Sequence, residues 1–67
     1  MIKVAEFRSP DGVRRGEVWA LDQGYRVILY ENSRQVHTVD LTSVLQKAEH
    51  IAEEYVYNKT TPEVLFG

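Results

Sequence analysis

The chain has 67 residues, with eight basic and ten acidic side chains, no cysteine and a formal net charge of −2. This length allows one domain with one core, and the lack of cysteine excludes a disulfide framework and a cysteine-based zinc site. Met1 leads directly into an alternating, charged segment rather than a signal peptide, and no apolar run approaches the ~20 residues of a membrane span. We therefore expect a single cytoplasmic domain, residues 1–67, that does not enter a membrane.

Alternating apolar and polar side chains predict β-strands over residues 2–8, 13–21 and 25–31. The turns between them, at 9–12 and 22–24, contain the proline and glycines that such turns favour. Gly16, inside the second strand, indicates a β-bulge. Residues 35–39 fit either a short fourth strand or an extended lead into a helix.

An amphipathic helix is predicted over residues 41–57, because its apolar residues recur at steps of one or three. Those residues are Val44, Leu45, Ala48, Ile51, Ala52, Tyr55 and Val56. Either Asp40 or Ser43 can cap its start, and Asn58 suits a left-handed residue at its end. An isolated helix of this length is marginal in water, so its apolar side must pack on the strands.

This order of elements predicts an α+β fold, a three- to four-stranded antiparallel β-meander over residues 2–39 with one C-terminal amphipathic helix on one sheet face. Residues 58–67 follow as a C-terminal tail. One helix covers only one face, yet the second and third strands carry large apolar side chains on both of theirs. The residues that we assign to the uncovered face are Trp19, Leu21, Ile28 and Tyr30.

A second apolar face on so small a protein indicates an interaction surface, either for a second copy or for another protein. Two alternatives remain open. In one, the C-terminal tail folds back over this face. In the other, Trp19 and the tyrosines lie flat with their polar tips in water.

The sequence shows no set of catalytic residues and no glycine-rich phosphate loop, and its serines suit turns or a helix cap. His50 has metal-ligand spacing to Glu53 and Glu54, but all three lie on the polar side of the predicted helix, where such side chains are usually solvated. We therefore expect no enzyme activity, no cofactor, no metal and no small-molecule substrate.

Basic residues are concentrated in the first half of the chain. Residues 1–36 hold six basic and five acidic side chains, whereas residues 37–67 hold two and five. Arg14, Arg15 and Arg26, with Tyr25 among the nearby aromatics, could contact a nucleic acid. We favour the alternative, in which the arginines pair with Glu17 and Glu31 on the sheet. The negative net charge also disfavours a nucleic-acid partner.

The order of three strands before an alanine-containing helix is similar to the plant ethylene-response type of DNA-binding domain. Its motifs are echoed locally by the segment Val4-Ala5-Glu6-Phe7-Arg8-Ser9-Pro10. In that family, arginines and tryptophans on the sheet read DNA, and these roles would fall to Arg14, Arg15, Trp19 and Arg26. The order of motifs departs from the family's, so the resemblance concerns architecture.

A second resemblance rests on two segments. They are Gly24-Tyr25 at the start of the third strand and the closing helix Ala48-Glu49-His50-Ile51-Ala52-Glu53-Glu54-Tyr55. Over most of residues 2–58 the chain resembles small uncharacterised proteins of marine cyanophages. That resemblance implies a small phage accessory protein that binds a host component. We therefore expect a non-enzymatic protein-binding module that binds a host protein or forms a homodimer through the uncovered sheet face.

Overall fold

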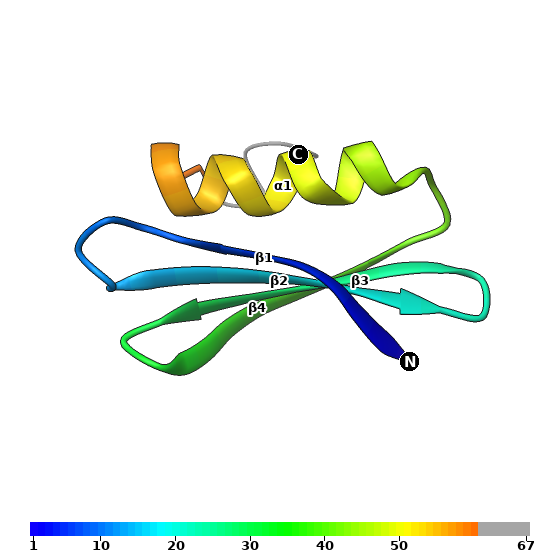
Figure 1. The fold of residues 1–67 in the computed structure, drawn as a ribbon, viewed down its shortest axis with the longest axis horizontal. Helices are drawn as coiled ribbons and strands as arrows, with labels where there is room; N and C mark the ends of the chain where they lie inside the picture. Colours follow the sequence, from blue (N-terminus) through cyan, green and yellow to red (C-terminus); the bar gives the residue numbers. More distant parts are fainter. Residues whose placement is uncertain (61–67) are drawn as a thin grey trace.

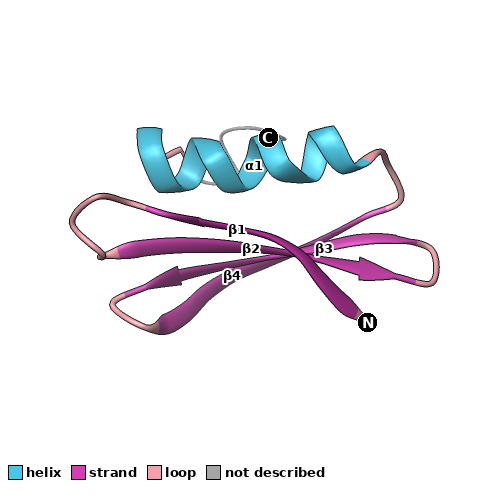
Figure 2. Ribbon diagram, in the orientation of Figure 1, coloured by secondary structure: helices cyan, strands magenta, loops and turns pink. Residues whose placement is uncertain are grey.

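The computed structural model describes residues 1–60, and they form a four-stranded antiparallel sheet followed by one helix (Figure 1). The sheet has the order β1-β2-β3-β4, and α1 lies across one of its faces (Figure 2). This confirms the predicted α+β meander. The elements are β1 Ile2–Arg8, β2 Arg14–Leu21, β3 Gly24–Glu31, β4 Arg34–Leu41 and α1 Leu45–Asn58. The prediction for the tail concerns mainly residues 61–67, which lie outside the described residues.

The fourth strand is complete, which decides between the two alternatives for residues 35–39. β4 pairs with β3 from Glu31 opposite Arg34 to Tyr25 opposite Leu41. Asn32 and Ser33 connect the two strands with φ values of 53° and 69°. Positive φ at both central residues is what a tight hairpin with the natural sheet twist requires.

The helix begins later than predicted and neither predicted residue caps it. Because β4 extends through Leu41, α1 starts at Leu45, and its N-cap is Val44, whose side chain makes no capping hydrogen bond. Asp40 instead accepts hydrogen bonds from Arg26 on the neighbouring strand. At the other end the left-handed residue is Lys59, with φ 58°, rather than Asn58. Within residues 1–60, no helix is both long and apolar enough to cross a membrane.

The core lies between α1 and the strands β1, β2 and β3. Its buried residues are Val18, Val27, Leu29, Ala48, Ile51, Ala52, Tyr55 and Val56. Gly16 is regularly paired with Phe7 and Leu29, so the predicted bulge there is wrong. A Cβ on Gly16 would lie 3.0 Å from the Ala52 Cβ. The glycine is therefore explained by the close approach of the helix.

The pairing is irregular at two other places: between Lys3 and Ala5 in β1, and opposite Leu29 and Tyr30, where β4 has an extra residue between Gln35 and His37. The β1 irregularity changes which way Lys3 points. Regular alternation would place Lys3 on the same side as Ala5. In the structure Lys3 lies opposite Trp19 and Ala5 lies opposite Val18, one residue further along β2. An extra residue in one strand reverses the alternation on one side of it. Lys3 thus points away from the helix, on the same side as Trp19.

Candidate functional site

The side of the sheet that faces away from α1, here called the open face, is not covered by any described element (Figure 1). Val18 and Val27 are buried beneath the helix, so the residues that alternate with them point the other way. Residues directly opposite one another on paired strands share a side, which extends the assignment to β1 and β4. The open face consists of Lys3, Glu6, Arg8, Arg15, Glu17, Trp19, Leu21, Arg26, Ile28, Tyr30, Gln35, Thr38 and Asp40.

The four predicted contact residues all lie on the open face. Trp19 is opposite Arg26, Ile28 is opposite Glu17, and Tyr30 is opposite Arg15. Leu21 closes the strand opposite Gly24. The side chains of Trp19, Leu21, Ile28 and Tyr30 are partly exposed rather than fully so. The structure therefore gathers them on one surface, but as an apolar centre that is partly shielded by its neighbours.

Glu17 lies at the middle of this apolar centre. From the sequence it was predicted only to pair with the arginines. It is 7% exposed. Its Oε1 accepts a hydrogen bond of 3.1 Å from Trp19 Nε1 and one of 3.2 Å from the Tyr30 hydroxyl. A buried polar group is tolerated when it is hydrogen-bonded. The indole and phenol therefore have a partner within the protein, in place of the solvated tips that one alternative assumed.

Long basic side chains cover the rest of this centre. The Arg15 guanidinium lies 4.1 Å from the centre of the Tyr30 ring, and its Nε is 3.5 Å from Glu17 Oε2. Lys3 Nζ is 2.8 Å from Glu6 Oε1 and 3.9 Å from Glu17 Oε2. Hydrogen bonds from Lys3 and Arg8 lower the pKa of Glu6 to about 2. The Arg15 guanidinium therefore shields part of the Tyr30 ring, and the Lys3 ammonium lies beside the carboxylates of Glu6 and Glu17.

The charges on β1 and β2 form rows of equal sign. Glu6 lies directly opposite Glu17, and Arg8 lies directly opposite Arg15. Like charges directly opposite each other are destabilising. Each row is compensated along the strands instead, because Arg8 binds Glu6 and Arg15 approaches Glu17. The open face thus presents a negative row beside a positive row.

The residues proposed for nucleic-acid contact are not brought together. Arg15 and Arg26 lie on the open face, whereas Arg14 and Tyr25 lie on the side of the helix. The Arg14 guanidinium is 5.7 Å from the ring centre of Tyr55, and Tyr25 packs against the core. No single surface can use all four residues.

The arginines make the mixed-sign contacts that the sequence favoured. Arg15 approaches Glu17, and Arg14 Nη2 lies 3.6 Å from Glu31 Oε2. Arg26 binds Asp40 across the strands through Nε at 2.7 Å and Nη2 at 3.0 Å, which lowers the pKa of Asp40. These basic side chains are therefore partly neutralised by carboxylates of the same sheet.

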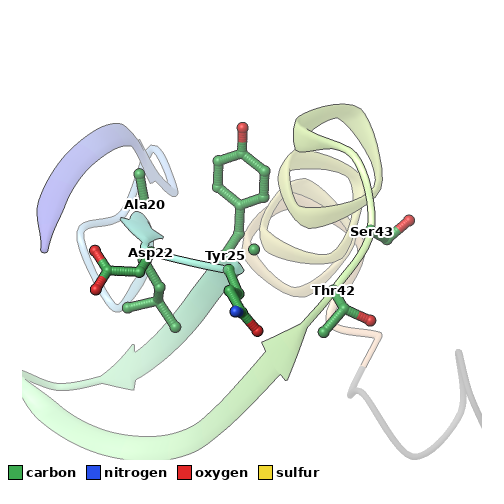
Figure 3. Close-up of a pocket in the computed structure, with 8 residues that line it drawn as sticks. Ala20, Asp22, Tyr25, Thr42 and Ser43 are labelled. Carbon is green, nitrogen blue, oxygen red and sulfur yellow. The ribbon is translucent and has the colours of Figure 1, made fainter.

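A hollow of about 450 Å³ lies between the β2–β3 turn and the segment that leads into α1 (Figure 3). Its labelled polar side chains point in different directions: Asp22 to one side, Tyr25 along the helix, and Thr42 and Ser43 away from both. General acid–base or nucleophilic chemistry requires such groups to approach one another. This hollow does not provide that geometry.

Metal-ligating residues do not cluster in the part of the chain that the structure describes. Residues 1–60 contain no group of three His, Asp or Glu side chains placed to hold an ion. His50 and Glu53 lie exposed on α1. No other described element therefore supplies a further ligand that would complete a metal site with these two residues.

Comparison with protein-family models, with curated proteins and with solved structures gave no match for this chain.

Proposed function

We propose that this chain is a non-enzymatic protein-binding module, and that its open face binds a second copy of itself. The observation that carries the proposal is the partly exposed group of Trp19, Ile28 and Tyr30 on a sheet face that no element within residues 1–60 covers. Aromatic residues and arginine are enriched in the cores of protein interfaces. Both are present here within one surface.

The charge rows favour a second copy as the partner. A two-fold interface brings the same surface of both subunits together in opposite directions. In such an arrangement Arg8 of one copy can meet Glu6 of the other, whereas Glu17 is buried and hydrogen-bonded within its own subunit. Opposite charges across an interface fix its register and steer association. In addition, domains of about 70 residues often gain stability from oligomerisation.

The molar mass in solution tests this proposal. We expect light scattering after size exclusion to show a mass that rises from monomer to dimer as the concentration increases, and less steeply at high salt. The Leu21→Glu variant places a charge at the end of the apolar centre and should remain monomeric. The matched control is Tyr57→Glu, because Tyr57 is 53% exposed on the helix, away from the open face.

Wild-type protein that stays monomeric throughout the concentration series would contradict self-association. Equal effects of the Leu21→Glu and Tyr57→Glu variants would also count against it. Another protein, such as the host component of a phage accessory protein, would then be the remaining protein partner for this face.

A second function rests on the four basic side chains of the open face, which are Lys3, Arg8, Arg15 and Arg26. With Trp19 and Tyr30 they combine the charges and stacking surfaces that single-stranded nucleic acid uses. The three carboxylates among them weaken this alternative. A gel shift with single-stranded oligonucleotides discriminates the two functions, because phosphate contacts weaken steeply as salt rises. Retarded DNA at low salt with a monomeric protein would favour the nucleic-acid function.

A further inference from the structure

The β1–β2 and β3–β4 turns lie at the same end of the sheet (Figure 1). A second, smaller cavity is lined by residues of these turns and of the adjoining strand ends. The backbone N–H of Asn32 donates to the Val13 carbonyl at 2.8 Å and joins these two turns. The cavity has a volume of about 120 Å³ and contains no acidic residue in its lining. Its lining residues are Arg8, Gly12, Val13, Arg14, Arg15, Tyr30 and Ser33.

Three arginines around one small cavity are an unfavourable arrangement unless an anion is nearby. Arg8 and Arg15 are directly opposite each other on neighbouring strands, and like charges in such pairs repel. Arg14, on the helix side of the sheet, is the third arginine in the lining. The positive charge is thus concentrated where two strand ends and two turns meet.

Arg15 provides an independent observation. Its Nε is buried and has no hydrogen-bond partner among the described residues. The nearest carboxylate oxygen, Glu17 Oε2, lies 3.5 Å away as an ion pair without hydrogen-bond geometry. A buried donor without an acceptor is unfavourable. This unsatisfied donor belongs to a residue that lines the cavity.

The carboxylates near the three arginines do not satisfy them fully. Glu6 accepts from Arg8 Nε, and Glu31 lies 3.6 Å from Arg14 Nη2. Each guanidinium has five N–H donors, so these contacts occupy a minority of the donors. Neither carboxylate lines the cavity.

We propose that this arginine cavity binds a phosphate group. A cavity can hold one water molecule when its accessible volume is about 10–15 Å³. The arginine cavity has about 120 Å³, which is enough for a compact anion with four oxygen atoms. Pockets for whole drug-sized ligands start at roughly 300 Å³, which excludes burial of a complete nucleotide. A single arginine can bind a carboxylate through two hydrogen bonds. The charge of three arginines is better balanced by a doubly charged phosphate. The phosphate is either a free ion or the terminal group of a larger molecule.

The site shares Arg8, Arg15 and Tyr30 with the open face, whereas Arg14 belongs to the cavity and not to the open face. Arg14 lies on the helix side of the sheet, so its substitution changes the cavity and leaves the apolar centre of the open face in place. Conversely, the Leu21→Glu variant should retain the anion site. Phosphate binding by a monomeric protein would therefore support this inference even if self-association failed.

Calorimetric titration of the full chain with inorganic phosphate, glycerol phosphate and acetate tests the inference. We expect phosphate to bind and the Arg14→Gln and Arg15→Gln variants to bind it about tenfold more weakly, since each loses charge-assisted hydrogen bonds to the anion. The matched control is Arg26→Gln, which removes the same charge at a distance from the cavity lining and should bind as wild type. Amide NMR spectra of the wild-type protein should show phosphate-dependent shifts for Gly12 and Ser33, a readout that needs no variant.

Binding of inorganic phosphate alone would identify a free ion as the ligand, and equal or tighter binding of glycerol phosphate would identify a terminal phosphate group. Both results support the site. It would be overturned if neither compound bound, if acetate bound as tightly, or if Arg26→Gln weakened binding as much as Arg14→Gln.

Discussion

The two faces of the sheet are built from the same strands but bury their side chains by different means. The strand residues that are fully buried under α1 are small or aliphatic, such as Gly16, Val18 and Leu29. The open face adds aromatic and long charged side chains, which cover one another. Trp19 and Tyr30 donate to Glu17, and Arg15 lies over the Tyr30 ring.

This difference shows how one sheet can keep a stable core on one side and an available surface on the other. The helix side depends on packing density, where small changes in volume matter. The open face depends on hydrogen bonds, ion pairs and a cation–π contact among half-buried side chains. The following predictions test whether the two faces are in fact maintained by these separate interactions.

The largest expected difference is between two neighbouring residues of β3. Leu29 is fully buried beneath the helix, whereas Ile28 is partly exposed on the open face. We expect Leu29→Ala to reduce the free energy of unfolding by ~2–5 kcal/mol and Ile28→Ala by about 1 kcal/mol or less. Urea denaturation followed by circular dichroism measures both. Equal losses would show that the open face is a second core.

Gly16 tests the packing of the helix side directly. Because a Cβ at this position would lie 3.0 Å from the Ala52 Cβ, Gly16→Val forces the helix away from the sheet and should cost ~1–3 kcal/mol. Ala20→Val, on the same face of β2 but only partly buried, is the control, and its thermal unfolding should change less. A Gly16→Val protein with an unchanged unfolding temperature would disprove the close contact.

Glu17 tests the polar contacts of the open face. Glu17→Leu removes the acceptor for Trp19 and Tyr30 and should reduce the free energy of unfolding by ~1–2 kcal/mol. Glu17→Gln retains a carbonyl oxygen and should lose less. The fluorescence of Trp19 reports on the same change, because the indole N–H gains access to water. If Glu17→Leu proved as stable as wild type, the hydrogen bonds to this carboxylate would have no structural role.

The smallest expected effect is the acid dependence that Glu6 contributes. Its pKa is lowered from 4.5 to about 2 in the folded protein by hydrogen bonds from Lys3 and Arg8. A carboxyl with a lowered folded pKa stabilises the fold above its unfolded pKa, and this contribution is lost as the pH falls from about 4.5 towards 2. Stability measured over this range should fall less steeply in the Glu6→Gln variant. Parallel curves for the two proteins would contradict the assignment.

The sequence predicted the elements of the fold correctly but not their junctions. Alternation and helical periodicity located the strands and the helix, because burial on one side imposes those periods. The β1 bulge, the length of β4 and the start of α1 depend on pairing between strands, which local propensity does not contain. Gly16 was misinterpreted for the same reason, since its neighbour Ala52 is distant in the sequence.

The open face was predictable in outline and not in detail. The alternation of side chains along the strands is enough to place Trp19, Leu21, Ile28 and Tyr30 on one surface. Glu17 became the centre of that surface only through contacts across two strands, and the arginine cavity arises where two turns meet. Such sets combine residues from separate segments, so their spacing along the chain carried no signal.

Isotope-filtered NMR on an equal mixture of labelled and unlabelled protein tests most directly whether the open face binds a second copy. We predict contacts between copies that involve the Trp19 indole and the methyl groups of Leu21 and Ile28. A dimer whose contacts between copies lie only on the outer side of α1, or no such contacts at high concentration, would contradict the account.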